Sequence, residues 1–353
     1  MRRIQTEHIK GRELLAKDVR GASGVVLISA GTILKKEYVD KLLELKVTDV
    51  FVEDEISMGI QVQDITEEKI SEQCTEKLKD TMERLSYASG EELQKLTRVT
   101  TEVMEGVLLQ DEVIYTISNV RNHSHSLYEH SLSVAALAAL IAVRAGYSQA
   151  EVKEIVMGAL LHDIGYPNVK ANYHGIFLDK APEEVQKEIK RHVVYGYITV
   201  EQQEWITPLA REIILYHHER LDRSGYPFHM PEDKLKPQVR LVSLCDAFDN
   251  MVYGNLEKRR KVHEALEEIR NARGTKFDAG LVDIFIRSVA AYPTGVIVEL
   301  SNGMYGIVVK QNADEPGRPM LRMVRRGQNG TWIPQQDVDL RDWPDVYIVD
   351  TTE

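Results

Sequence analysis

One short stretch constrains this chain more than any other. The apolar run at residues 159–161 leads directly into His162 and Asp163, and Gly165 follows two residues later. Consecutive helical residues point about 100° apart, so this histidine and this aspartate can flank one point in space. The two oxygens of a carboxylate can each bind a different metal ion. Taken alone, the doublet is better explained by a helix that ends near a glycine with polar residues at its end.

Other histidines and an aspartate stand at regular intervals around this pair. They are His130 upstream, and His192, the doublet His217-His218 and Asp246 downstream, with gaps of 25 to 32 residues between successive positions. Such gaps suit one ligand position per helix of a bundle. Adjacent histidines on an apolar helix need polar partners when they are buried, and two neighbouring metal ions would satisfy both. The spacing therefore indicates a metal centre assembled from several helices.

Two of these positions belong to longer motifs. His162-Asp163-Ile164-Gly165, and His217-His218-Glu219-Arg220 leading into Gly225-Tyr226-Pro227, resemble the HD-GYP branch of the HD metal-dependent phosphohydrolases. The resemblance covers roughly residues 115–290, and Asp246 with Asp249 has the family's D-x-x-D spacing. It implies a mainly α protein with an HD-type helical bundle as its catalytic domain.

The same resemblance implies a set of metal ligands. They are expected at His130, His162, Asp163, His192, His217, His218 and Asp246, with Asp163 as the bridging carboxylate. Imidazole and carboxylate ligands without cysteine suit iron, manganese or zinc rather than a structural zinc site. Relatives with a third metal add a glutamate where this chain has Ser126. We therefore expect two divalent ions, with iron or manganese preferred over zinc.

Two such ions ~3.5–4 Å apart can hold a hydroxide that attacks phosphorus, and they stabilise both the entering and the leaving oxygen. His162 and Asp163 are the expected catalytic residues. The resemblance adds the substrate, cyclic di-GMP, which would be opened to linear pGpG, with a second cleavage to GMP left open. The sequence does not separate cyclic di-GMP from a mixed GMP-AMP cyclic dinucleotide.

Substrate contacts are expected at Lys180, Arg220, Asp222, Tyr226 and Lys258. Three departures from the family pattern affect this region: Tyr166 replaces a phosphate-binding lysine, Asn255 replaces an arginine, and Arg223 replaces a glycine. A charge-assisted contact is worth roughly 1.5–3 kcal/mol, so two lost cations would weaken binding of a doubly charged dinucleotide. The cations that could replace them are Lys170, Lys180, Arg220 and Arg223.

Three functions are therefore compatible with the sequence. An active cyclic-dinucleotide phosphodiesterase is supported by the complete ligand set. A metal-loaded sensor that binds the dinucleotide without cutting it is supported by the lost lysine and arginine. A hydrolase of another phosphate ester is the third, because the wider HD class is broad in substrate. We favour the first, since a protein that had abandoned catalysis would have little use for all seven ligands.

Local signals delimit the helices of the catalytic region, residues 115–292. Ser148 and Glu151 form a capping box at the start of the helix that ends at His162. One helix that begins near Pro182 is expected to carry His192. Pro208 marks the start of the helix that leads to His217-His218.

The segments on either side predict smaller modules. Residues 1–54 read as a small α/β module with strands near residues 24–28 and 48–52 and a helix at residues 35–45. Residues 55–114 read as a helical connector whose apolar stripe could pack on a second copy of the chain, forming a homodimer.

Residues 293–353 change to a period of two and predict a small β domain. Its first hairpin is expected to turn at Asn302-Gly303 in a type I′ conformation. A second hairpin is expected to pair residues 320–326 with residues 331–333.

Composition excludes other classes of function. The chain is 43% hydrophobic and 28% charged, and no apolar run approaches the ~20 residues of a membrane span. A net charge of −11 argues against binding to a nucleic-acid polymer. The first residues lack a signal peptide's apolar core, and Cys74 and Cys245 stand in no metal or redox spacing. We expect a cytoplasmic protein with a small anionic ligand.

Overall fold

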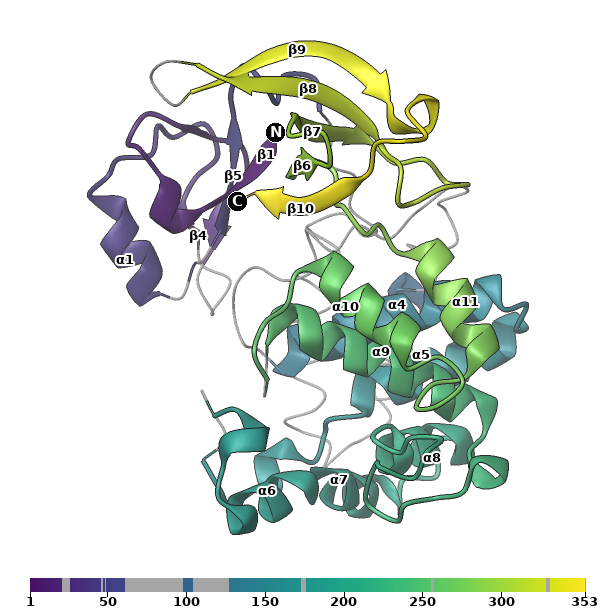
Figure 1. Ribbon diagram of the computed structural model, residues 1–353. Coiled ribbons are helices and arrows are strands. Elements are labelled where there is room, and N and C mark those ends of the chain that lie inside the picture. Colours follow the sequence, from purple (N-terminus) through teal and green to yellow (C-terminus); the bar gives the residue numbers. More distant parts are fainter. Residues whose placement is uncertain are drawn as a thin grey trace. The chain divides into compact units, whose positions relative to one another are not determined.

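A computed structural model of the chain describes residues 1–20, 26–45, 47, 49–60, 98–103, 127–172, 176–254, 257–327 and 331–352. These residues form two compact units (Figure 1). The helical unit contains every residue expected at the metal centre. The other unit, called here the β unit, combines the described residues of 1–60 with those of 289–352.

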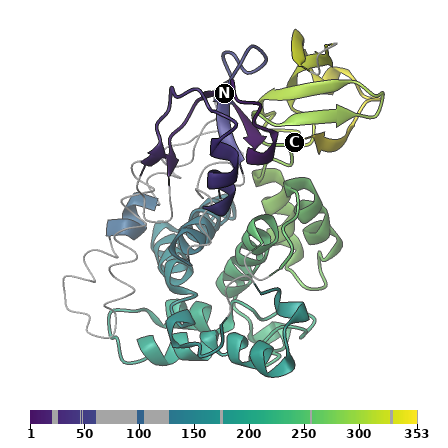
Figure 2. The same cartoon turned by 90° about the vertical axis from the view of Figure 1, so that its left-hand side faces the viewer.

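The helical unit is a bundle built around one apolar helix. That helix, α4 (Leu127–Arg144), packs against α5, α9 and α11, while α5 also packs against α8. Figure 2 shows the bundle turned by 90°. The other elements are α5 (Gln149–Leu161), η4 (Tyr166–Asn168), η5 (Leu178–Lys180), α6 (Glu183–Lys190), α7 (His192–Val200), α8 (Pro208–Tyr216), η6 (Glu232–Lys234), α9 (Pro237–Tyr253), α10 (Val262–Asn271) and α11 (Ala279–Ser288).

The apolar character of α4 follows from its place in this bundle. By length and composition α4 could cross a membrane, but 72% of its apolar window is buried inside the protein. It is therefore a core helix that positions His130 from within.

Capping explains where the neighbouring helices begin. The predicted capping box of α5 is confirmed: the Ser148 hydroxyl accepts from the Glu151 backbone N–H, and the Glu151 carboxylate accepts from the Ser148 N–H. The Thr207 hydroxyl caps α8, with Pro208 at the first helical position. The prediction of one helix from Pro182 through His192 was wrong, because the chain turns at Arg191 and forms α6 and α7 instead.

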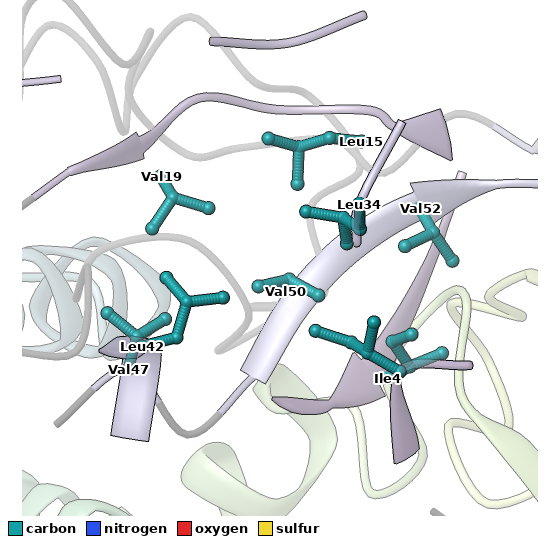
Figure 3. Packing of buried hydrophobic residues seen from close by; sticks show 9 residues of the cluster. Ile4, Leu15, Val19, Leu34, Leu42, Val47, Val50 and Val52 are labelled. Atoms are coloured by element: carbon teal, nitrogen blue, oxygen red, sulfur yellow. The ribbon is translucent and has the colours of Figure 1, made fainter. Parts of the chain in front are cut away.

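The N-terminal part of the β unit has two small sheets and one helix. Strands β1 (Arg2–Gln5), β5 (Asp49–Glu53) and β2 (Leu14–Leu15) pair antiparallel in that order, and β3 (Val19–Arg20) pairs with β4 (Val26–Ile28). The turn η1 (Thr6–His8) and helix α1 (Tyr38–Glu44) complete it. Apolar side chains from the five strands and from α1 meet in one core, in which Ile4, Leu34 and Val50 lie close together (Figure 3).

The C-terminal part is a five-stranded antiparallel sheet in the order β10-β6-β7-β8-β9. Its elements are β6 (Ile297–Leu300), β7 (Tyr305–Lys310), β8 (Met320–Arg326), β9 (Trp332–Asp339), η7 (Leu340–Asp342) and β10 (Ile348–Thr352). The expected type I′ turn was wrong. Gly303 has a positive φ of 79° but Asn302 does not, and the Gly303 N–H donates to the Leu300 carbonyl. A type I′ turn needs positive φ at both central residues.

The two parts of the β unit share a core. Ile56 and Ile60 pack with Ile297, Ile307 and Val324 of the C-terminal sheet. In addition, the guanidinium of Arg322 on β8 donates to the carbonyl oxygens of Ile56 and Met58. The segment after β5 is thus bound to the C-terminal sheet by apolar and polar contacts together.

The architecture expected from the sequence is confirmed: a helical bundle with small β-containing modules. Most of the predicted connector lies outside the described residues. Its described part, residues 98–103, is helical and buries Val99 and Val103.

Candidate metal centre

The structure brings together the seven side chains predicted as metal ligands. Six of these residues are at most 5% exposed, and the side chain of the seventh, His218, is 15% exposed. They are His130 within α4, His162 and Asp163 directly after α5, His192 at the start of α7, His217 and His218 directly after α8, and Asp246 within α9.

Asp163 lies at the centre of this cluster. Its Oδ2 is 3.5 Å from Nε2 of His130 and 3.3 Å from Nε2 of His162. Its Oδ1 is 3.4 Å from Nε2 of His192 and 3.6 Å from Nε2 of His217. Each oxygen of one carboxylate thus faces a different pair of imidazoles. A carboxylate in this position can serve two cations, one at each oxygen.

Asp246 adds a second carboxylate on the His130 side. Its Oδ1 lies 3.2 Å from Nε2 of His130 and also accepts a hydrogen bond from Asn250 Nδ2 at 2.7 Å. Its Oδ2 lies 3.5 Å from Nδ1 of His218. Potential ligand atoms that all lie within 4.8 Å of one another form two groups that share Asp163: His130, His162 and Asp163 in one, and Asp163, His192, His217 and His218 in the other.

Three histidines use Nδ1 to cap the end of the preceding helix. His162 Nδ1 lies 2.7 Å from the carbonyl oxygen of Ala159, and His192 Nδ1 lies 2.8 Å from that of Ile189. His217 Nδ1 is similarly close to two carbonyl oxygens of α8. A carbonyl only accepts, so Nδ1 donates and Nε2 keeps its lone pair for the cluster. The last carbonyls of a helix lack intrahelical partners, and these imidazoles supply them.

His130 is oriented differently because it lies inside a helix. Its Nδ1 donates to Oδ2 of Asp249 at 2.6 Å, and the other oxygen of Asp249 accepts from the Ser133 hydroxyl. Asp249 is 1% exposed. In the sequence, Asp249 was conspicuous only for its spacing, although position i+3 from Asp246 places it about one helical turn further along α9.

Within the cluster, hydrogen-bond acceptor atoms face one another. Nε2 of His130 and Nε2 of His162 lie 3.1 Å apart. Asp163 Oδ1 and Asp246 Oδ2 are buried and have no hydrogen-bond partner among the described residues. Buried acceptors without a donor are costly, and a cation between them satisfies several at once. The nitrogen and oxygen donor set suits divalent metal ions, so the residues present fit the expected group.

At two of the imidazoles the protonation state also suits cation binding. Burial lowers the pKa of His192 to about 4 and holds the pKa of His218 well below its usual range. Both imidazoles are therefore neutral at pH 7, the form that binds a metal. At His162, by contrast, burial is outweighed by Asp163 and Asp246, which raise the imidazole pKa well above its usual range, so a cation has to displace that proton. Burial would raise the pKa of Asp163 and Asp246, but the surrounding imidazoles hold both carboxyl pKa values well below their usual range.

Two glycines permit the close contacts that this geometry needs. A Cβ on Gly165 would stand 1.9 Å from the carbonyl oxygen of His192. A Cβ on Gly225 would stand 2.3 Å from the carbonyl oxygen of His218. Glu219, 2% exposed, accepts from the backbone N–H groups of Phe228 and Met230 and so holds the loop that contains Gly225 against α8.

Two tyrosines stack on the second ligand group. Tyr166 lies flat on His192, with ring centroids 4.3 Å apart and an angle of 14° between the planes. Tyr226 lies on His218, with centroids 4.6 Å apart and an angle of 26°. Tyr166, at the position of the family's lysine, is therefore packed against a predicted ligand and only 6% exposed.

Of the five predicted substrate contacts, two touch a predicted ligand among the described residues: Tyr226 stacks on the His218 ring, and Arg220 donates to the His217 carbonyl oxygen. Arg220 donates to the carbonyl oxygens of its own loop and to Ser243, and it lies over Phe277. Asp222 accepts from Ser224 within one turn. Lys180 and Lys258 are exposed, with Lys180 over the ring of Phe177. Ser126 and Asn255 lie outside the described residues.

Residues 127–251 match the HD domain family. A cyclic di-GMP phosphodiesterase of Pseudomonas aeruginosa is 28% identical over 243 residues, which are 68% of this chain and 58% of the relative. A cyclic di-GMP phosphodiesterase of Thermotoga maritima is 33% identical over 181 residues, which are 50% of this chain and 48% of the relative. The chain thus spans about half the length of these curated relatives.

A solved structure shows the same fold. An HDG"Y"P protein from Bdellovibrio bacteriovorus superposes with a TM-score of 0.56 at 17% sequence identity, covering 80% of this chain and 97% of the other. The resemblance to HD-GYP proteins that the motifs predicted is confirmed.

Proposed function

We propose that this chain, which carries an HD domain over residues 127–251, is a metal-dependent phosphodiesterase that opens cyclic di-GMP to pGpG. The position of Asp163, with each oxygen facing a different pair of imidazoles, carries the proposal. Two relatives that are named cyclic di-GMP phosphodiesterases support the choice of substrate.

Each ligand group would hold one divalent cation. His130, His162 and Asp246 would bind the first, and His192, His217 and His218 would bind the second, with Asp163 shared between them. When bound, two such ions lower the pKa of a water molecule and stabilise the charge that develops at phosphorus. Imidazole nitrogens and carboxylate oxygens suit iron, manganese or zinc, and of these we expect iron or manganese.

The protein contributes orientation and a dry site. The Nδ1 hydrogen bonds of His162 and His192 fix which nitrogen faces the cluster, so little reorganisation is needed when a cation binds. Burial of Asp163 excludes water that would screen its charge. A phosphodiester that enters from the His218 side, the most exposed part of the cluster, would meet both groups together.

One observation favours a second candidate function, a sensor that binds the dinucleotide without cutting it. Tyr166 stands where the family has a phosphate-binding lysine, and its ring is stacked on His192. Loss of that cation would reduce stabilisation of a charged transition state more than it would reduce metal binding.

The test is a chromatographic assay of the full chain, loaded with manganese or iron, together with metal analysis. Appearance of pGpG at two metals per chain is the expected result. The double variant His162→Ala, Asp163→Ala should lose hydrolysis and at least one metal. Undiminished turnover by that variant would remove the site assignment. Full metal occupancy with intact cyclic di-GMP would favour the sensor, and a binding titration would then separate a sensor from a hydrolase of another phosphoester.

A further inference from the structure

The position that carries a phosphate-binding lysine in the family carries no charge here. The phenol ring of Tyr166 is 6% exposed and packs flat against His192. If the cluster binds a phosphodiester, another cation has to neutralise the phosphate outside the metal ligands. Arg220 is held against its own loop by three hydrogen bonds from Nη1, to two backbone carbonyl oxygens and to Ser243, and its other N–H groups make it a second candidate beside Lys190.

Lys190 lies on the side of the metal-ligand cluster that contains His192 and His218. It is the last residue of α6, two residues before His192, and it is half-buried. Its Nζ lies over the ring of Tyr226, 5.4 Å from the centroid. That ring stacks on His218 and has its centroid 6.3 Å from that of His192. One aromatic ring therefore lies between the ammonium group and two predicted ligands.

The charge of Lys190 has no protein counter-ion among the described residues, whereas other basic residues around the end of α6 do. Lys187 pairs with Glu183 at 2.7 Å, and Arg191 pairs with Glu188 at 3.2 Å. A partly desolvated ammonium group without a carboxylate partner favours an anionic ligand, and phosphate oxygens accept strong charge-assisted hydrogen bonds.

The aromatic contact also keeps the side chain in place. Tyr226 belongs to the loop that Glu219 holds through two backbone N–H groups, so its ring is a fixed surface beside His218. An ammonium group over such a ring gains cation–π stabilisation and loses part of its rotational freedom before a ligand arrives.

We propose that Lys190 binds a phosphate group of the substrate at the edge of the metal centre, in place of the cation that is missing at position 166. The proposal rests on the proposed function, because it assumes that the centre acts on a phosphodiester. Lys190 thereby sets affinity for the anionic substrate, while the metal ligands remain as described.

The experiment compares Lys190→Met, which keeps the length of the side chain without its charge, with Lys190→Arg, which keeps the charge. Lys187→Met is the matched control, since it removes an exposed, ion-paired lysine from the same helix. Each variant of the whole 353-residue chain is loaded with manganese, assayed with cyclic di-GMP for KM and kcat, titrated calorimetrically with inorganic phosphate, and analysed for metal.

Lys190→Met should raise KM and weaken phosphate binding by about tenfold, the low end for loss of a charge-assisted contact at a partly exposed site. Metal content should not change, and kcat should change less than KM. Lys190→Arg should recover most of the affinity, and Lys187→Met should match the wild type.

Two failures can be told apart. Wild-type protein that binds phosphate but leaves cyclic di-GMP intact would refute the proposed function, and the phosphate titration of Lys190→Met would still decide the role of Lys190. Unchanged phosphate affinity in Lys190→Met, or the same loss in Lys187→Met, would overturn the proposal for Lys190. Absence of phosphate binding by the metal-loaded wild type would overturn it as well.

Discussion

Nδ1 of His130 donates to Oδ2 of Asp249 at 2.6 Å, across 119 residues of sequence. The contact joins α4 to α9 and leaves Nε2 of His130 facing Asp163 and Asp246. An imidazole that donates to a carboxylate is a more basic ligand and is held in one orientation. Asp249 is therefore a positioning residue for His130 rather than a ligand itself.

Replacing Asp249 should weaken metal binding without removing a ligand. Asp249→Asn keeps the shape of the side chain but loses its charge, and we expect a roughly 10–100-fold loss of metal affinity. Competition with a fluorescent chelator measures that affinity. Asp283→Asn, which removes an exposed carboxylate paired with Arg273, is the control and should bind metal like the wild type. Equal affinities in all three proteins would show that Asp249 does not position His130.

Gly165 should tolerate no side chain. In Gly165→Ala the new Cβ would meet backbone atoms, the His192 carbonyl oxygen at 1.9 Å and the Gly196 nitrogen at 2.4 Å. Helix α7 must then move, and we expect a loss of about 3 kcal/mol in the free energy of unfolding together with weaker metal binding. Urea denaturation measures the first effect. Gly280→Ala on α11, where the nearest atom is 3.4 Å away, should be neutral or slightly stabilising.

Removal of metal should destabilise the helical unit. Without cations, buried acceptors such as Asp163 Oδ1 lack a partner among the described residues. A cation present at 100 times its dissociation constant contributes about 2.7 kcal/mol. Chelation should therefore lower Tm by roughly 5–10 °C for a unit of this size. Calorimetry with and without EDTA provides the measurement, and re-addition of manganese should restore Tm. An unchanged Tm would mean that no cation is bound in the folded protein.

The shared core of the β unit predicts a long-range effect. Ile56 is 1% exposed and packs with Ile297, Ile307 and Val324 of the C-terminal sheet. Ile56→Ala should cost about 2–4 kcal/mol of unfolding free energy. The fluorescence of Trp332, which packs on the same cluster, reports the transition in urea. Met58→Ala, at a residue that is 67% exposed, should have little effect. An unchanged fluorescence transition in Ile56→Ala would show that residues 56–60 do not contribute to the free energy of unfolding of that sheet.

Features that depend on residues close together in the sequence were predicted correctly. The capping box at Ser148 depends on residues within one helical turn, and the structure contains it. The seven proposed ligands were found because histidines on apolar helices are conspicuous, and because the resemblance gave their order. The structure places all seven side chains in one cluster, and their role as ligands stays a prediction.

Contacts between distant residues left no local pattern and were not predicted. The stacking of Tyr166 on His192 and the place of Lys190 over Tyr226 depend on how separate loops and helices meet. The break between α6 and α7 at Arg191 lies beside a side-chain hydrogen bond. There, His192 Nδ1 donates to the Ile189 carbonyl oxygen at the end of α6. Likewise, the union of residues 56–60 with the C-terminal sheet joins segments more than 200 residues apart, as Arg322 to Ile56 shows.

Anomalous diffraction from crystals of the manganese-loaded protein tests most directly whether Asp163 bridges two cations. Two anomalous peaks are expected about 3.5–4 Å apart, each beside a different oxygen of Asp163. One peak should lie next to His130 and His162, and the other next to His192 and His217. A single peak, or two peaks that both lie away from Asp163, would contradict the binuclear centre on which the proposed hydrolysis depends.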